Sequence, residues 1–508
     1  MSVTQPSPTD TALRRSIAAT LLPGFVGTTL PAWLEERLRN GLGGVCVFGQ
    51  NVESVAQLRE LTDAIYAANP DAIVAIDEEG GDVTRLYYET GSPFPGNAVL
   101  GRLGDDAYTE AIARRVGEEL HAAGVNLDFA PDVDINSNAD NPVIGVRSFG
   151  SLPAVVAEQG AAWTRGLQSA GVAVCAKHFP GHGDTAADSH LELPVVELTL
   201  EELRERELEP FRAVIDAGAR TVMTSHILLP RIDPDLPATF SRTIVEGLLR
   251  GELGFGGVVV TDALDMHGAS GERGIPEAAV LALAAGCDLL CIGTENTDAQ
   301  LAEIEDAIVA AVVEGRIAVT RIEEAAGRVL ALAAAVRADG AAHEAASRGA
   351  GVIDPADVRR AVEAFDISEH ASSWLRSHQG RYSVVRVDTV ANIAIGEAPW
   401  GPFAEVAAEA DATSAFAANP LVVFTEGDHP NLVLAAQSPV LVVGKDNHRH
   451  AFARAAIDRL RAERDVLVVD MGWPSDDRRY ADIATFGASR LVGRALIELL
   501  DGEPGRTP

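Results

Sequence analysis

Ionisable side chains gather in one short stretch of the sequence, Lys177–His190, which holds one lysine, three histidines and two aspartates. The stretch directly follows an apolar run that predicts a buried strand. Because Pro180–Gly181 interrupts any continuous helix, His178 and His182 cannot share a helical face as a zinc-binding pair. The stretch is therefore predicted to be a shaped loop that carries acid–base chemistry.

Asp188 and His190 stand two positions apart at the end of this stretch. In an extended segment both side chains project to the same side, so the carboxylate can orient the imidazole. An imidazole that titrates near pH 6.5 can donate a proton in one step and accept one in the next. We predict this pair to be the acid/base of the site.

Eight short apolar runs alternate with amphipathic helical patterns between residues 18 and 340. The runs cover residues 21–25, 44–48, 72–76, 125–129, 172–176, 221–224, 257–261 and 288–292. Helices are expected at 54–68 and at 106–123, where Gly124 ends the second. Such repeated βα units predict an α/β fold, a (β/α)8 TIM-type barrel, with a doubly wound open sheet as the alternative.

A second domain is expected beyond the Ala- and Gly-rich residues 337–352. Strand-like runs at 382–387, 421–424, 440–443 and 466–469, with helices near 355–364, 449–462 and 488–500, predict a smaller α/β sandwich. The predicted domains are a TIM-barrel catalytic domain at residues 1–345 and the C-terminal sandwich at 346–508.

Composition excludes several classes of partner. The 508 residues contain 41 Lys plus Arg against 74 Asp plus Glu, a net charge of −33, which repels nucleic acids and anionic membranes. No apolar run reaches the roughly 20 residues of a membrane span, and the first twenty residues lack a signal-peptide pattern, so a cytoplasmic location is expected. The four cysteines lie in apolar runs, which predicts buried thiols.

The loop 132–150 superficially resembles a calcium-binding loop, because Asp132, Asp134 and Asn136 alternate. Ser137 stands where an EF-hand requires glycine, and the required glutamate is missing at position twelve. We expect no metal and no cofactor, and interpret these side chains as structuring the loop.

Lys177–Thr185 followed by Asp188–His190 resembles the signature of glycoside hydrolase family 3, in its β-N-acetylglucosaminidase branch. Hydrolysis of a glycoside requires one group that stabilises positive charge at the anomeric carbon and another that protonates the leaving oxygen. Asp262, after the seventh run, suits the first role, and the resemblance implies that it is the nucleophile. The alternatives for this region are a helix-cap role for Asp262 and participation of Asp265.

The resemblance also implies the sugar-binding residues. They are Asp77, Arg85, Arg147, Lys177 and His178, whose carboxylate, guanidinium, ammonium and imidazole groups suit hydroxyl and acetamido partners. A salt bridge between Asp77 and Arg85 is the structural alternative for those two residues.

The predicted function is that of a retaining β-N-acetylglucosaminidase acting on small soluble glycans, with peptidoglycan recycling as the expected setting. Inorganic phosphate is an alternative acceptor to water, because a deprotonated histidine is neutral and does not repel an anion. Two alternatives remain: a β-glucosidase whose acid/base is Glu426 in the second domain, and a catalytically silent sugar-binding protein.

Overall fold

The computed structural model describes residues 10–185, 193–343, 351–378, 380–408, 414–428, 434 and 438–502. The chain forms two compact units. The first contains residues 1–78, 106–135 and 151–350, and the second contains residues 79–105, 136–150 and 351–508. The predicted boundary between 345 and 346 falls within residues that the structure does not describe, so it stays a prediction.

In the described residues, the first unit is built on eight parallel strands, as the sequence predicted. They are β1 (Leu21–Leu22), β2 (Gly44–Val47), β3 (Ile73–Ile76), β4 (Leu127–Asp128), β5 (Ala173–Phe179), β6 (Thr221–Thr224), β7 (Val258–Thr261) and β8 (Leu290–Cys291). Strands β2 to β7 pair in sequence order, and β1 pairs with β8. Backbone hydrogen bonds from Cys46 to Pro23 and from Thr261 to Leu289 join these two sheets into a TIM-like barrel.

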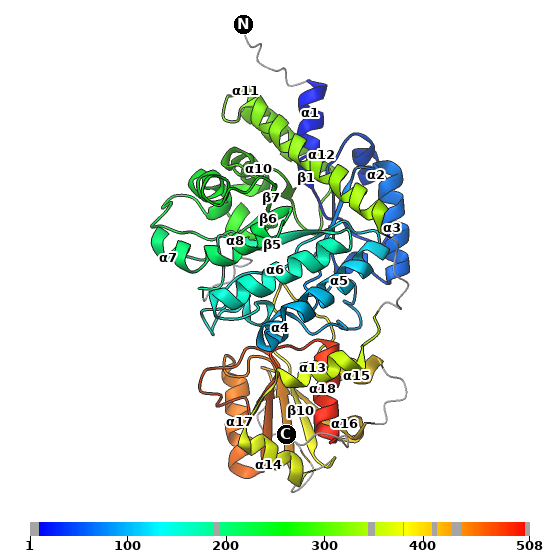
Figure 1. The fold of residues 1–508 in the computed structure, drawn as a ribbon, viewed down its shortest axis with the longest axis vertical. Helices are drawn as coiled ribbons and strands as arrows, with labels where there is room; N and C mark the ends of the chain where they lie inside the picture. The colour runs from blue at the N-terminus through cyan, green and yellow to red at the C-terminus, as the bar shows by residue number, and fades with distance from the viewer. Residues whose placement is uncertain are drawn as a thin grey trace. The chain divides into compact units, whose positions relative to one another are not determined.

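Helices follow the strands, and α5 and α6 pack side by side (Figure 1). The helices are α1 (Thr11–Ala18), α2 (Ala32–Arg39), α3 (Val55–Ala68), α5 (Asp106–Ala122), α6 (Pro153–Ser169), α7 (Leu200–Glu205), α8 (Leu208–Asp216), α9 (His267–Ser270), α10 (Gly274–Ala285), α11 (Asp298–Val313) and α12 (Val319–Ala342). Short 3-10 turns occupy Gly49–Asn51 and Ala238–Phe240, and Thr243–Glu252 is a π-helix. The predicted helices at 54–68 and 106–123 are confirmed, including the left-handed Gly124.

Apolar side chains fill the barrel interior. Strand residues such as Ile73, Leu127 and Val260 form one buried cluster, which Leu332 of α12 joins. All four cysteines are buried free thiols, as predicted. The interior is therefore a packed core, and polar chemistry is confined to the ends of the strands.

A buried charge cluster holds the start of β8. Asp288 is fully buried and accepts hydrogen bonds from Arg250 on the π-helix at 2.5 Å, and from Arg321 and Arg328 on α12 at 2.5 and 3.1 Å. The same carboxylate accepts the backbone N–H of Val259 in β7. These charge-assisted bonds tie the last two strands to the helices outside them.

The second unit contains a six-stranded sheet in the order β11-β10-β12-β13-β14-β9, parallel except for β9. Its strands are β9 (Asp366–Ile367), β10 (Ser383–Val387), β11 (Leu421–Phe424), β12 (Val440–Gly444), β13 (Val466–Asp470) and β14 (Ile483–Ala484). Its helices are α4 (Asn97–Leu103), α13 (Pro355–Glu363), α14 (Glu369–Ser377), α15 (Gly401–Ala408), α16 (Ala415–Ala418), α17 (Ala451–Glu463) and α18 (Arg490–Asp501), with a 3-10 turn at Gly145–Arg147. The predicted smaller α/β domain is confirmed.

Two segments that follow barrel strands belong to this second unit. Within it, Asp82 accepts the backbone N–H of Ala488 at 2.7 Å, and Asn392 donates to the Pro142 carbonyl at 2.8 Å. These bonds attach residues 79–105 and 136–150 to the C-terminal part of the chain.

Candidate active site

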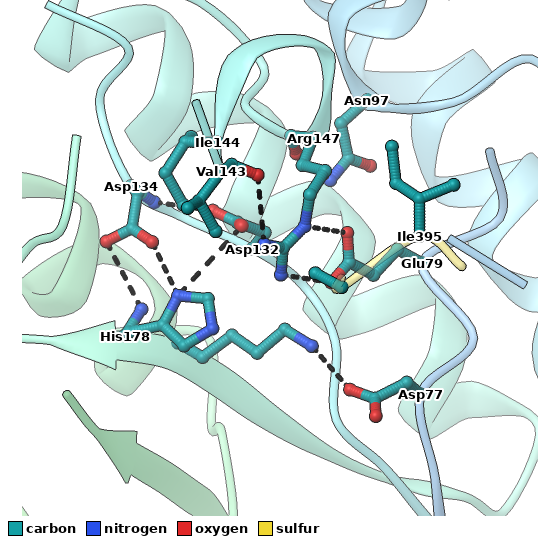
Figure 2. A network of polar contacts seen from close by, with 12 residues as sticks. Asp77, Glu79, Asn97, Asp132, Asp134, Val143, Ile144, Arg147, His178 and Ile395 are labelled. Atoms are coloured by element: carbon teal, nitrogen blue, oxygen red, sulfur yellow. Dashed lines mark hydrogen bonds and ion pairs between the residues drawn. The ribbon is translucent and has the colours of Figure 1, made fainter. Parts of the chain in front are cut away.

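Lys177 and Asp77, both predicted to bind sugar, meet in the first unit. Lys177 lies in β5 and Asp77 directly follows β3, so both stand at the carboxyl ends of barrel strands. The lysine Nζ is 2.7 Å from the aspartate Oδ1 (Figure 2). The lysine side chain is 2% exposed and the aspartate side chain 19% exposed. The buried ammonium thus fixes a carboxylate that remains partly accessible to a ligand.

His178 is oriented by the buried Asp134. The carboxylate of Asp134 lies 2.6 Å from His178 Nδ1 and accepts the His178 backbone N–H at 3.2 Å (Figure 2). It also accepts the backbone N–H of His182 at 2.6 Å. Burial alone would raise the pKa of Asp134, but His178 and these hydrogen bonds lower it overall. The carboxylate therefore stays ionised and holds the imidazole with Nδ1 towards it.

Asp132, Asp134 and His178 have ligand atoms within 4.8 Å of one another, a spacing that a metal ion could use. The described contacts give these atoms other partners. Asp134 accepts three N–H groups, and Asp132 accepts the backbone N–H of Asp134 at 3.0 Å. We therefore interpret the group as a hydrogen-bonded support for His178.

The signature loop is tightly packed at both of its glycines, and only Gly181 has the positive φ that glycine permits. Gly181 has φ +125°, and a Cβ at this position would lie 2.6 Å from Glu207 Oε2. A Cβ on Gly183 would overlap the Ile135 carbonyl oxygen. The segment therefore lies so close to its neighbours that side chains are excluded at both positions.

Ionisable groups under this segment have strongly shifted pKa values. Burial lowers the pKa of His182 to about 4, so its imidazole is neutral at physiological pH. Burial raises the pKa of Glu207 to about 7, partly opposed by Arg206. Arg206 donates to Glu207 and Asp184, each at 2.6 Å. The arginine thereby ties the loop to the turn between α7 and α8.

Asp262, the predicted nucleophile, directly follows β7. Its Oδ1 accepts the backbone N–H of Ala263 at 2.8 Å, and its own N–H donates to the Thr224 carbonyl at 3.3 Å. The next helix, α9, has Met266 as its N-cap, so Asp262 does not cap it. The carboxylate is thus held at the carboxyl end of a barrel strand by local backbone bonds.

Asp265, the competing carboxylate, has a different environment. It is exposed, and its Oδ2 accepts the backbone N–H of Thr294 at 3.2 Å. This bond ties the segment after β7 to the segment after β8, which gives Asp265 a loop-holding role.

Arg147 and Arg85, the remaining predicted binding residues, lie in the second unit. Arg147 makes a bidentate pair with Glu79 at 3.0 and 2.7 Å and donates to the Val143 carbonyl (Figure 2). Arg85 donates to the carbonyl oxygens of Ala394 and Ile395. Both guanidinium groups are therefore held in fixed orientations by partners of their own unit.

The predicted acid/base pair, Asp188 and His190, lies outside the described residues. Sequence reasoning also missed supporting residues, because Asp134, Glu79 and His226 were not assigned to the site. The signal available for His226 was its position, two residues after the end of β6.

Within the described part of the chain, helices long and apolar enough to cross a membrane are absent.

Comparisons with known proteins agree with this architecture. The model of the glycosyl hydrolase family 3 N-terminal domain matches residues 30–332. A β-hexosaminidase of Nitrosospira multiformis is 41% identical over 288 residues, which cover 55% of this chain and 82% of that protein. β-Hexosaminidase A of Pseudoalteromonas piscicida is 40% identical over 284 residues, 52% of this chain but only 48% of that protein, so the match spans about half of the relative's length.

A solved structure extends the similarity over both units. The family 3 β-N-acetylglucosaminidase from Paenibacillus sp. FPU-7 has a TM-score of 0.81 and 31% sequence identity, and the match covers 97% of each chain. With the family model covering well over half of the residues, the chain belongs to glycosyl hydrolase family 3.

Proposed function

We propose that this protein is a retaining β-N-acetylglucosaminidase that removes terminal β-linked N-acetylglucosamine through a covalent glycosyl-aspartate. The observation that carries the proposal is the position of Asp262, whose carboxylate follows β7 and is held by the Ala263 N–H. The β-hexosaminidase and β-N-acetylglucosaminidase names of the relatives support the choice of sugar.

In the proposed first step, a carboxylate oxygen of Asp262 attacks the anomeric carbon while the bond to the leaving oxygen breaks. His190, oriented by Asp188, donates its proton to that oxygen. In the second step the neutral His190 takes a proton from water, and the water oxygen displaces Asp262. Two inversions give net retention of configuration.

Asp77, Lys177, His178, Arg85 and Arg147 are proposed to bind the sugar. Asp77 supplies acceptors for hydroxyl groups, and the cationic side chains supply donors for hydroxyl and acetamido oxygens. Small soluble glycans are the proposed substrates. Cytoplasmic recycling of peptidoglycan fragments is the proposed setting.

The test of substrate class is turnover of matched aryl β-N-acetylglucosaminides and β-glucosides. We expect the N-acetylglucosaminide to be the better substrate by kcat/KM. Faster turnover of the glucoside would favour the β-glucosidase alternative. Glu426, which is exposed in the turn after β11, is the acid/base in that alternative, and Glu426→Gln would then test its role. Absence of turnover on both would favour the silent sugar-binding protein.

Phosphate is a second proposed acceptor, because the deprotonated His190 leaves the site without a negative acid/base to repel an anion. Products formed in phosphate and in phosphate-free buffer distinguish the two acceptors. Sugar 1-phosphate made at the expense of free sugar would support phosphorolysis, and free sugar alone would reject it.

A further inference from the structure

We infer that His226 is a positioning residue for Asp262, and that it acts by holding the backbone of Ala263. The inference rests on the proposed function, because it concerns the group proposed as nucleophile. It assigns a role to a buried polar side chain that the proposed reaction does not otherwise use.

His226 makes one hydrogen bond from each ring nitrogen. The residue is fully buried and lies two positions after the end of β6. Its Nε2 lies 3.1 Å from the carbonyl oxygen of Ala263, and its Nδ1 lies 2.9 Å from Thr239 Oγ1. The ring therefore bridges the segment after β6 and the segment after β7.

The direction of the first bond follows from its acceptor. A carbonyl oxygen can only accept, so Nε2 must carry the proton that it shares with Ala263. Thr239 Oγ1 lies 2.9 Å from both His226 Nδ1 and the Ser225 carbonyl oxygen. The Thr239 hydroxyl donates to that carbonyl, and His226 Nδ1 lies against the same hydroxyl oxygen. The imidazole is therefore held by a partner at each ring nitrogen.

The Nε2–H donor holds the residue next to the nucleophile. Ala263 donates its N–H to Asp262 Oδ1 at 2.8 Å while its carbonyl oxygen accepts from His226. The Asp262 N–H is held by the Thr224 carbonyl of β6. The end of β6 thus holds the backbone on both sides of the Asp262 carboxylate, and losing the imidazole would free Ala263 to rotate and take its N–H away from the nucleophile.

Packing alone is the competing explanation. The imidazole stacks on the Phe240 ring, with 6.3 Å between the ring centroids and 27° between the ring planes. The guanidinium carbon of Arg273 lies 5.0 Å from the centroid of the Phe240 ring. If His226 only fills this space, its substitution should change the stability of the protein, and the position of the hydrogen-bonding group in the new side chain should not matter. A positioning residue requires a donor at the place of Nε2.

Two amide substitutions separate these explanations. In His226→Gln the amide nitrogen can reach the place of Nε2, whereas in His226→Asn it reaches only the place of Nδ1. The measurement is the rate of glycosyl-enzyme formation from an activated aryl N-acetylglucosaminide, together with KM and the thermal unfolding midpoint. We expect glycosylation to fall at least about tenfold in His226→Asn but only about threefold in His226→Gln, with KM little changed in both. Equal rates in the two variants, or losses confined to KM, would overturn the inference.

A second pair keeps the test decisive if both His226 variants unfold. Thr239→Ser retains the hydroxyl that faces Nδ1, whereas Thr239→Val removes it and leaves the ring without the partner that fixes its orientation. We expect the serine variant to form the glycosyl-enzyme at nearly the wild-type rate and the valine variant to form it more slowly. Equal rates would count against the role of His226. If the wild-type protein itself forms no glycosyl-enzyme, the proposed reaction fails and the positioning role fails with it. If the wild type forms the glycosyl-enzyme and the variants have equal rates, only the positioning role fails.

Discussion

The ammonium group of Lys177 lies 2.7 Å from the carboxylate of Asp77, and this ion pair joins the carboxyl ends of β5 and β3. The lysine is buried whereas the aspartate is partly exposed. A buried cation that touches a partly accessible anion fixes the orientation of the anion, so each residue depends on the other for its role in sugar binding.

Lys177→Met should reduce kcat/KM by about 10- to 100-fold, because it keeps the apolar stem but removes the charge that holds Asp77. Asp77→Asn should cause a loss of similar size. The double variant should lose less than the sum of the two single losses, since both remove the same interaction. Steady-state kinetics of all four proteins would measure this coupling, and independent, additive losses would show that the pair does not act as a unit.

Glu207→Gln should flatten the dependence of stability on pH. Burial raises the pKa of Glu207 from 4.5 to about 7 in the folded protein, so stability falls as pH rises through this window, because only the unfolded chain ionises freely. The loss should reach about 3 kcal/mol above pH 7. Glutamine cannot ionise, so the variant should lack this loss.

Thermal unfolding of both proteins between about pH 4.5 and about pH 8 measures the difference. Glu205→Gln, at an exposed position on α7, is the matched control and should follow the wild-type curve. Parallel curves for wild type and Glu207→Gln would contradict the assigned cause.

His190→Ala should slow substrates with poor leaving groups far more than substrates with activated phenols, because only the former need a proton from the enzyme. The comparison is kcat/KM for a series of aryl N-acetylglucosaminides of increasing phenol pKa. Equal slowing across the series would make His190 a binding residue.

The sequence predicted the barrel because each strand lies in a short apolar run, and these runs alternate with helical patterns along the chain. Seven of the eight predicted runs contain the observed strands, and the eighth, 172–176, is exceeded by β5, which continues through Lys177 to Phe179. β9 and β14 were missed because neither lies in an apolar run of the kind that contains the equally short β1, β4 and β8. The grouping of residues 79–105 with the C-terminal part of the chain was also missed, because it depends on bonds such as Asp82 to Ala488, whose partners are far apart in the sequence.

The candidate site was predictable where a motif carries the chemistry, as in Lys177 and His178. Its supporting residues were not. Asp134 and His226 act through backbone atoms of other loops, and such partners are set by the fold rather than by local spacing. A polar residue within a few positions after a barrel strand was the available signal, but that signal is shared by residues with loop-holding roles such as Asp265.

The central claim is that Asp262 forms the covalent intermediate, and trapping that intermediate tests it most directly. The wild-type protein, Asp262→Asn and Asp265→Asn are each incubated with a slow fluorinated N-acetylglucosaminyl analogue, and intact mass and peptide mapping locate the adduct. We predict an adduct on Asp262 in the wild type and in Asp265→Asn, and no adduct in Asp262→Asn, because an amide cannot act as the anionic nucleophile. Labelling that persists in Asp262→Asn, or that maps to Asp265 in the wild type, would contradict the account.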